Sequence, residues 1–342
     1  MPALKNQLPA YTILIAFIAG GLLNYLFNQY ADSSVAIQPT TIEAVAAPET
    51  NCDVTSTRVG GYKYIKPLLF ADQSCESTRF SAVKSAIGSL VNSSQLSGDV
   101  SKVSVYLREF EHGKWMGLNE EEAYHPASLI KVPIMMAILR MADDQPGLLD
   151  QEIVYDDIPK EMVRSKQNYV TEVIVPGKKY TVRELLRYMI SYSDNNAQLL
   201  LVKYLKPTNF DHMFTDMGIG LPMEESTNQI LLSAKDYSAF IKTLFNASYL
   251  TPSKSEFALS LMKDCSFKDG FIKGLPTDMK VVHKFGEWDD KRDFELHESG
   301  VIYILNKAYL LTVMTRGNSR EKLPGVIANV TEIIYGELVK LP

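Results

Sequence analysis

The pattern of hydrophobic and polar positions changes twice along the chain and outlines its organisation. Residues 102–109 alternate with the period of a half-buried strand, and His112-Gly113 forms a turn into a second short strand near Trp115. Apolar residues then recur at helical spacing through the middle of the chain, and strand-like segments return after it. The expected helices cover 79–91, 127–142, 191–204, 233–245, 254–263 and 326–339, with another opening at Thr181, and the later strands cover 280–285, 297–305 and 309–316.

Strands at both ends of the domain with helices between them predict an α+β fold. We expect one antiparallel sheet assembled from both ends, flanked by helices, with an all-helical subdomain inserted between its strands. A cleft is expected where the two parts meet, because substrates bind in such clefts.

The N-terminal region has a different pattern. Residues 10–27 form an apolar run that is long enough to cross a bilayer, with Lys5 before it and no basic residue after it until Arg58. The positive-inside bias predicts that residues 1–9 are cytoplasmic, that 10–27 are a single-pass membrane anchor, and that the rest is extracytoplasmic. A cleaved signal peptide, which leaves a secreted or periplasmic protein, and a buried core helix are the alternatives.

Residues 28–57 are rich in Ala, Ser, Thr and Pro, which predicts a flexible linker leading to a folded domain at 58–342. Outside the cytoplasm Cys52 and Cys75 are candidates for a disulfide, although their separation in sequence leaves the pairing open. Cys265 lies in an apolar stretch and is expected to be a buried thiol.

The composition excludes several classes of function. The 342-residue chain is 46% hydrophobic and 22% charged, as in an average globular protein, and its net charge of −5 argues against a nucleic-acid partner. Five scattered histidines and three cysteines provide no HExxH or other zinc spacing, and no glycine-rich phosphate loop is present. We therefore expect neither a metal nor a cofactor.

Three short motifs in the domain carry candidate chemistry, and the first two supply a nucleophile with its base and a proton relay. Ser128 and Lys131 form S-x-x-K at the start of an apolar helix, where a lysine in an apolar pocket can lose its proton and act as base to the serine. The Ser193-Asp194-Asn195 motif supplies a hydroxyl that can relay a proton and an amide that can hold a carbonyl, with the aspartate bracing the loop. Taken alone, each motif also fits an ordinary helix cap.

The third motif is His283-Lys284-Phe285-Gly286 at the end of a strand, where the lysine provides a cation and the glycine permits close approach of a substrate backbone. In this order the three motifs resemble the S-x-x-K, S-D-N and K-T-G signatures of the class A β-lactamases and penicillin-binding proteins. The resemblance covers about residues 58–342 and implies a β-lactamase/transpeptidase-like fold.

The resemblance also implies a role for each matched residue. Ser128 would attack a carbonyl and form an acyl-enzyme, with Lys131 as general base or as part of a proton relay, and Ser193 would pass a proton to the leaving nitrogen. Asn195 would hold an amide of the substrate, and Lys284 would attract its carboxylate beside Gly286. The backbone N–H groups of Ser128 and Glu287 would form the oxyanion hole.

Two departures from the family pattern affect the expected activity. Phe285 replaces the usual hydroxyl residue, and we expect His283 or the segment 297–300, best Ser299, to supply a substitute donor. The segment before Ser233 lacks the E-x-x-L-N setting of the deacylating glutamate, which leaves Glu224 as a candidate base, with Glu225 or plain surface charge as alternatives.

The sequence therefore predicts an exported serine hydrolase that forms an acyl-enzyme with β-lactams and hydrolyses them, as in antibiotic resistance. A D-alanyl-D-alanine carboxypeptidase or esterase acting on cell-wall peptides and a slowly deacylating penicillin-binding sensor are the rivals. The expected partners are a small substrate of these kinds and, through the N-terminal helix, a membrane.

Overall fold

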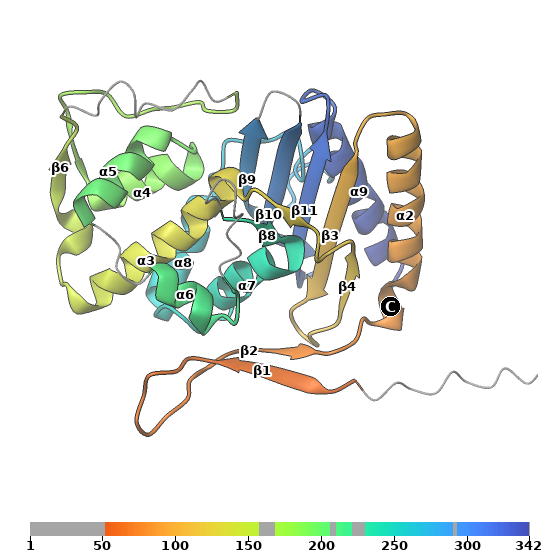
Figure 1. The fold of residues 1–342 in the computed structure, drawn as a ribbon, viewed down its shortest axis with the longest axis horizontal. Helices are drawn as coiled ribbons and strands as arrows, with labels where there is room; N and C mark the ends of the chain where they lie inside the picture. The colour runs from red at the N-terminus through yellow and green to blue at the C-terminus, as the bar shows by residue number, and fades with distance from the viewer. Residues whose placement is uncertain (1–51, 157–167, 206–209, 221–229, 290–292, 342) are drawn as a thin grey trace, which may run out of the picture. The chain divides into compact units, whose positions relative to one another are not determined.

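A five-stranded antiparallel sheet forms the centre of the domain, in the order β4-β3-β11-β10-β9 (Figure 1). Its strands come from both ends of the domain, as the sequence predicts, and β11 pairs with β3 so that Val313 lies opposite Val105. The computed structural model describes residues 52–156, 168–205, 210–220, 230–289 and 293–341. The strands are β3 (Lys102–Glu109), β4 (Trp115–Leu118), β9 (Val281–Asp289), β10 (Phe294–Ile304) and β11 (Lys307–Gly317).

Two helices cover one face of the sheet, α2 (Ser81–Leu96) and α9 (Leu323–Leu338), which lie side by side in Figure 1. Their apolar stripes and the facing strand residues form one core, which includes Val83, Ile327 and Leu311. The thiol of Cys265 is fully buried in this core, as expected from its apolar surroundings.

The opposite face carries the inserted helices. In this part α3 is the central element, with Val132 to Leu139 almost entirely buried, and α7 packs directly on β11. Capping boxes start two of the helices, Thr181 with Glu184 and Ser233 with Asp236. The helices are α3 (Lys131–Asp144), α4 (Val182–Ser191), α5 (Asn195–Leu205), α6 (Phe210–Asp216), α7 (Ala234–Phe245) and α8 (Pro252–Lys263).

Short elements complete the described part of the chain. Besides the hairpin described below, two strand pairs are antiparallel in this part of the structure. Three single turns of 3₁₀ helix each precede a longer helix or a strand. These elements are β5 (Ala123–Tyr124) with β8 (Leu232–Ser233), β6 (Glu152–Val154) with β7 (Lys179–Thr181), and η1 (Thr78–Phe80), η2 (Ala127–Ile130) and η3 (Leu148–Asp150).

Two expected helices start differently in the structure. The helix predicted at 127–142 begins as the 3₁₀ turn η2, and its α-helical part starts only at Lys131. The helix predicted at 191–204 starts at Asn195, because Ser193 has a φ of 61° and therefore breaks the helical path after α4. Both differences lie at the candidate motifs, so the local backbone there is set by more than helix propensity.

A hairpin precedes the sheet and corrects the predicted domain boundary. Strand β1 (Val54–Arg58) pairs with β2 (Leu68–Gln73), and a disulfide joins Cys52 to Cys75 with Cα atoms 5.5 Å apart. Strand β1 thus occupies the end of the stretch predicted as linker, and the compact unit begins at Cys52 rather than at residue 58. The alternating residues of β1 are mostly exposed and polar, so they gave no apolar period to recognise.

The predicted membrane anchor at 10–27 lies outside the described residues. Within the part of the chain that the structure describes, no helix has the length and apolar character needed to span a bilayer.

Candidate active site

Ser128 lies half-buried on the 3₁₀ turn η2, directly before α3. The residue before it, Ala127, has a φ of 50°, a left-handed conformation that is uncommon for alanine and is found at functional sites. The turn is fixed from both sides, since the Leu129 N–H donates to the Pro126 carbonyl at 2.9 Å and the Tyr237 hydroxyl donates to the Leu129 carbonyl at 3.0 Å. The serine is therefore presented on a turn held by its surroundings.

Strand β9 packs against this turn at Gly286. A Cβ atom at Gly286 would lie 2.7 Å from the Pro126 carbonyl oxygen and 3.0 Å from the Leu129 nitrogen. From the sequence we expected Gly286 to allow close approach of a substrate backbone. In the structure it allows close approach of the protein's own backbone at Pro126 and Leu129. The glycine brings the turn that carries Ser128 against the strand that carries Lys284.

Lys131 joins the first motif to the second. It is the first residue of α3 and is fully buried. Its Nζ donates to the Ser193 carbonyl, to Ser193 Oγ at 3.2 Å and to Asn195 Oδ1 at 2.7 Å. The left-handed φ of Ser193 belongs to the turn in which both its carbonyl and its hydroxyl contact Lys131 Nζ.

Lys284 joins the third motif to the second. Its Nζ donates to Ser193 Oγ at 2.9 Å and to the Phe285 carbonyl at 2.9 Å, and burial lowers its pKa to about 8. A hydroxyl oxygen has two lone pairs and one hydrogen. Both lone pairs of Ser193 Oγ thus accept from lysines, which leaves its O–H group as the function available to donate.

Asp194 braces the loop, as the sequence analysis expected. Its Oδ2 accepts from the Ile174 N–H at 2.7 Å and its Oδ1 accepts from the Asn196 N–H at 2.8 Å. Burial raises the pKa of this carboxyl, although the backbone hydrogen bonds act in the opposite direction. The carboxylate therefore holds the start of α5 and the preceding segment together.

Glu287 follows Gly286 on β9, beside the turn of Ser128. Its carboxylate accepts from the Asn168 amide and lies 3.4 Å from Arg320 Nε. The next residue, Tyr169, packs edge-on against the ring of Phe285, with centroids 5.8 Å apart. The side chain of Glu287 thus links the segment at 168–169 to this end of β9, while its backbone belongs to the strand beside Ser128.

The structure corrects the expected replacement for the missing hydroxyl at Phe285. The ring of Phe285 is 2% exposed and stacks on Phe267 with centroids 4.9 Å apart. His283, on the same face of β9, is fully buried, and its Nδ1 lies 2.5 Å from Glu298 Oε1. Its imidazole therefore faces a buried carboxylate rather than a cleft.

Ser299, the preferred candidate, is also committed elsewhere. Ser299 lies opposite Lys284 in the register of β9 and β10, on the expected face, and is fully buried as Lys284 is. Its Oγ is 2.6 Å from Thr312 Oγ1, which in turn is 2.7 Å from Ser238 Oγ. These three hydroxyls satisfy one another within the packing of α7 on the sheet.

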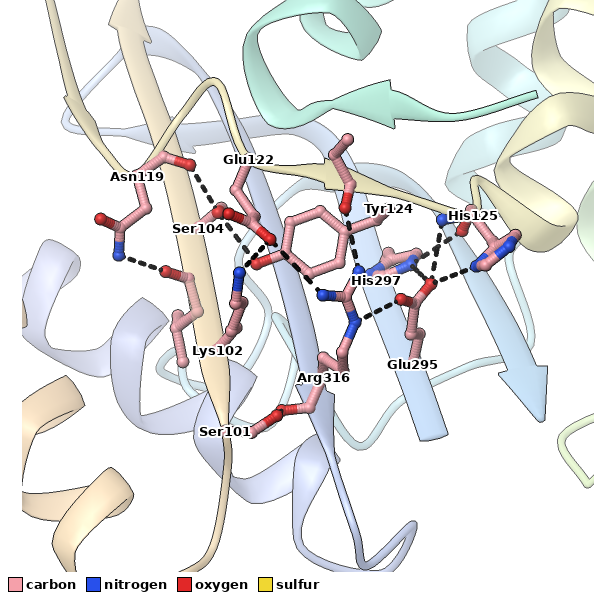
Figure 2. A network of polar contacts seen from close by, with 12 residues as sticks. Ser101, Lys102, Ser104, Asn119, Glu122, Tyr124, His125, Glu295, His297 and Arg316 are labelled. Atoms are coloured by element: carbon pink, nitrogen blue, oxygen red, sulfur yellow. Dashed lines mark hydrogen bonds and ion pairs between the residues drawn. The ribbon is translucent and has the colours of Figure 1, made fainter. Parts of the chain in front are cut away.

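A polar network that the sequence analysis missed holds the chain leading to Ser128 (Figure 2). Glu295 Oε2 accepts from the His125 N–H at 3.0 Å, and its Oε1 accepts from Arg316 Nε at 2.7 Å. Burial acts to raise the pKa of Glu295, but hydrogen bonds from His297 and Arg316 outweigh it and hold that pKa below its usual value. The charged carboxylate of Glu295 thus holds the backbone at His125, three residues before Ser128.

His297 and Arg316 complete this network. The Thr315 N–H donates to His297 Nδ1 at 3.3 Å, while His297 Nε2 lies 3.0 Å from the His125 carbonyl oxygen and 3.5 Å from Glu295 Oε2. Arg316 Nη2 donates to the Ala123 carbonyl at 2.9 Å. The only sequence signal for this arrangement was the alternation of polar residues on β10, which by itself is typical of many strands.

The candidate deacylation base Glu224 and its neighbour Glu225 lie outside the described residues. Among the predicted residues that are described, the structure brings together Ser128, Lys131, Ser193, Asn195, Lys284, Gly286 and Glu287 at the junction of η2, α5 and β9. It places His283 and Ser299 in buried contacts beside that junction.

Comparisons with known proteins bear on the family and the fold. A model of the β-lactamase enzyme family matches residues 82–338. The β-lactamase VEB-1 of Pseudomonas aeruginosa is 25% identical over 185 residues, 49% of this chain and 61% of its own length. A β-lactamase of Proteus vulgaris is 26% identical over 261 residues, 70% of this chain and 83% of its own length. The match thus spans less than two thirds of VEB-1.

Solved structures share the fold at low identity. A β-lactamase from Chitinophaga pinensis is 21% identical with a TM-score of 0.64, covering 75% of this chain and 99% of that one. The protein PBP-A is 18% identical with a TM-score of 0.62, covering 76% of this chain and 96% of that one. Because the family model extends over most of the described domain and the three motifs converge within it, the chain belongs to the β-lactamase enzyme family.

Proposed function

We propose that this protein is a serine acyl-transfer hydrolase that forms an acyl-enzyme with β-lactams at Ser128. The observation that carries the proposal is the position of Ser193 Oγ, which accepts from Lys131 at 3.2 Å and from Lys284 at 2.9 Å. One hydroxyl thereby links all three motifs. Its remaining O–H is the group that a departing amine nitrogen requires.

In the proposed reaction, Ser128 Oγ attacks the carbonyl carbon of the substrate and loses its proton, directly or through a relay, to Lys131, which acts in its neutral amine form. The backbone N–H groups of Ser128 and Glu287 stabilise the resulting oxyanion. The carbon–nitrogen bond then breaks as Ser193 donates its proton to the nitrogen, and the lysines at its oxygen resupply that proton. With a β-lactam this half-reaction gives one product, an acyl ester on Ser128 in which the former ring nitrogen carries the transferred hydrogen and stays attached through the opened ring.

Hydrolysis of that ester distinguishes two kinds of protein. A β-lactamase needs a base that activates water, and Glu224 is the candidate. The segment before Ser233 lacks E-x-x-L-N, and this favours a second candidate function, that of a slowly deacylating penicillin-binding peptidase or sensor. In that case penicillin acylates Ser128 and the adduct persists.

Intact-mass spectrometry of the protein mixed with a penicillin, followed over hours, tests the proposal. We expect an adduct of the mass of the drug on the wild type and none on Ser128→Ala. An adduct that clears while the drug is consumed indicates a β-lactamase, and Glu224→Gln should then make it persist. An adduct that persists on the wild type indicates the penicillin-binding alternative. Equal labelling of Ser128→Ala would overturn the assignment of the nucleophile.

We also propose that the domain works outside the cytoplasm, held there by the apolar run at 10–27. The Cys52–Cys75 disulfide supports this, because structural disulfides persist in oxidising compartments. Protease treatment of intact cells should degrade the domain, or should do so after removal of an outer membrane where one is present. Protection until the inner membrane is lysed would contradict the proposal.

A further inference from the structure

The hairpin of β1 and β2 is outside the family match, which begins at residue 82. Its connecting loop is closed by the Val59 N–H, which donates to the Pro67 carbonyl at 2.9 Å. We call residues 59–68 the hairpin tip. Nothing in the proposed acyl-transfer chemistry uses these residues, so the tip is an addition whose purpose has to be sought in its own surface.

The tip concentrates exposed apolar side chains. Tyr62 is 48% exposed, Tyr64 is 85% exposed, Ile65 is 58% exposed and Leu68 is 46% exposed. Single exposed apolar residues, such as Leu96 and Leu305 elsewhere on the domain, are ordinary. Four within seven consecutive positions form a patch that points to a partner.

The charge of the hairpin is opposite to that of the chain. Residues 54–73 contain Arg58, Lys63 and Lys66 against one acidic residue, Asp72, in a protein whose net charge is −5. Lys63 Nζ lies 5.0 Å from the centre of the Tyr64 ring, and Arg58 donates to the Lys66 carbonyl at 2.8 Å. Cations and aromatic rings are thus interleaved at one end of the hairpin.

Both ends of the hairpin contact the domain, since Arg140 Nη2 donates to the Tyr62 hydroxyl at 3.5 Å beside the tip and several contacts hold the base. The disulfide closes its base, and Asp72 on β2 pairs with Lys242 at 2.6 Å and with Arg108 at 2.5 Å. Trp115 Nε1 also donates to the Gln73 carbonyl at 2.8 Å. A patch held in this way loses little conformational freedom when it binds, which favours binding.

We propose that the hairpin tip docks into the interfacial region of an anionic phospholipid bilayer. Tyrosine rings are favoured at the level of the headgroups, a branched apolar residue such as Ile65 enters the acyl boundary, and lysines near the surface are attracted by anionic lipids. The N-terminal sequence supports this occupant over a protein. Only residues 28–51 separate the apolar run at 10–27 from Cys52, and even fully extended they reach about 80 Å.

Vesicle binding by residues 52–342 tests the proposal without the N-terminal segment, since this unit contains both apolar cores of the domain. We expect the unit to sediment with vesicles of phosphatidylcholine and phosphatidylglycerol and to bind phosphatidylcholine alone much more weakly. The double variant Tyr64→Ser, Ile65→Ser should reduce the partition coefficient by about tenfold or more. The double variant Lys63→Glu, Lys66→Glu should remove the preference for phosphatidylglycerol and the dependence on salt.

The matched control is Leu96→Ser with Leu305→Ser, which removes two equally exposed apolar residues away from the tip and should leave binding unchanged. Equal partition of wild type and tip variants would overturn the proposal. So would self-association in solution that the tip variants abolish while vesicles have no effect, because the tip would then bind a second copy.

A second measurement uses the full chain in a bilayer. The fluorescence of the tryptophan introduced by Tyr64→Trp should be quenched by lipids brominated on their acyl chains. The fluorescence of the tryptophan introduced by Leu305→Trp should not be quenched. Equal quenching at both positions would contradict docking by the tip. Every variant should still be acylated by penicillin at the wild-type rate, so failure of this proposal and failure of the proposed catalytic function give different results.

Discussion

The two faces of strand β9 carry different chemistry. On one face, Lys284 bonds to Ser193 and Gly286 lies against the turn of Ser128. On the other face, Phe285 stacks on Phe267, and His283 lies against Glu298 in a fully buried pair. Side chains alternate across a strand, but Lys284 Nζ also lies 4.1 Å from the centre of the Phe285 ring, so the two faces meet at this cation. Lys284 and Gly286 contact the candidate catalytic groups, whereas Phe285 packs behind them and against the Lys284 cation.

The largest expected effect comes from removing the charge on the first face. Lys284→Met keeps the length of the side chain but takes away the cation that contacts Ser193 Oγ. We expect the rate of acylation by penicillin to fall by about 10²–10⁴-fold, the usual range for loss of a group in proton transfer. The free energy of unfolding should stay level or rise, because burial of this ammonium is costly enough to lower its pKa to about 8.

Stopped-flow acylation and urea unfolding measure these two quantities on the same preparation. Lys280→Met is the control, since Lys280 lies just before β9 with its Nζ 4.3 Å from the centre of the Tyr303 ring, away from Ser193. Acylation at the wild-type rate by Lys284→Met would show that the contact with Ser193 has no catalytic role.

The second prediction concerns the glycine on that face. Gly286→Ala places a methyl group 2.7 Å from the Pro126 carbonyl, closer than real contacts allow, so strand and turn must move apart. We expect acylation to slow by about 10²-fold, since a displacement of about 1 Å at a reacting group has this effect. Gly325→Ala, at an open position in the first turn of α9, is the control and should acylate normally.

The third prediction is a dependence on pH. The pKa of Lys284 is lowered to about 8 by burial, so its cation is lost as the pH rises through that value. We expect acylation to decline above pH about 8, by up to tenfold per pH unit, and Lys284→Met to show no such decline. The sign for stability is the reverse. Between pH about 8 and the ordinary lysine pKa, the unfolded chain binds more protons at this group than the folded chain does. The free energy of unfolding therefore rises with pH across this range.

Much of this arrangement was predictable because local patterns determine it. The period of two at 102–109 corresponds to β3, and the capping box at Thr181 starts α4 as expected. The resemblance that rests on the three motifs placed Lys131, Ser193 and Lys284 in one site, and both lysines contact Ser193 Oγ. These features depend on spacing along the chain, which a sequence records directly.

The remaining features depend on which residues meet across the fold. Ser299 is on the predicted face of β10, yet its hydroxyl is taken by Thr312 from the neighbouring strand. Gly286 is explained by the backbone of Pro126, and Glu295 by the N–H of His125, contacts that span more than a hundred residues. No pattern within β9 or β10 specifies those partners, so a site can be located from its motifs while the groups that position it stay hidden.

The smallest expected effect on acylation comes from the second face. Phe285→Leu keeps an apolar side chain but leaves part of the space beside Phe267 and Tyr169 empty. We expect the free energy of unfolding to fall by about 1–2 kcal/mol, because a buried aromatic ring loses contacts without a new polar group being added. Acylation should fall by only about two- to fivefold, since Lys284 keeps its hydrogen bond to Ser193 Oγ and loses only the contact of its Nζ with the ring, whose centre is 4.1 Å away. The same urea and stopped-flow measurements apply, and Leu296→Met, a change of similar volume in the same core, serves as a reference for the cost of repacking. A fall in acylation as large as that of Gly286→Ala, at unchanged stability, would mean that the two faces of β9 act as one unit in catalysis.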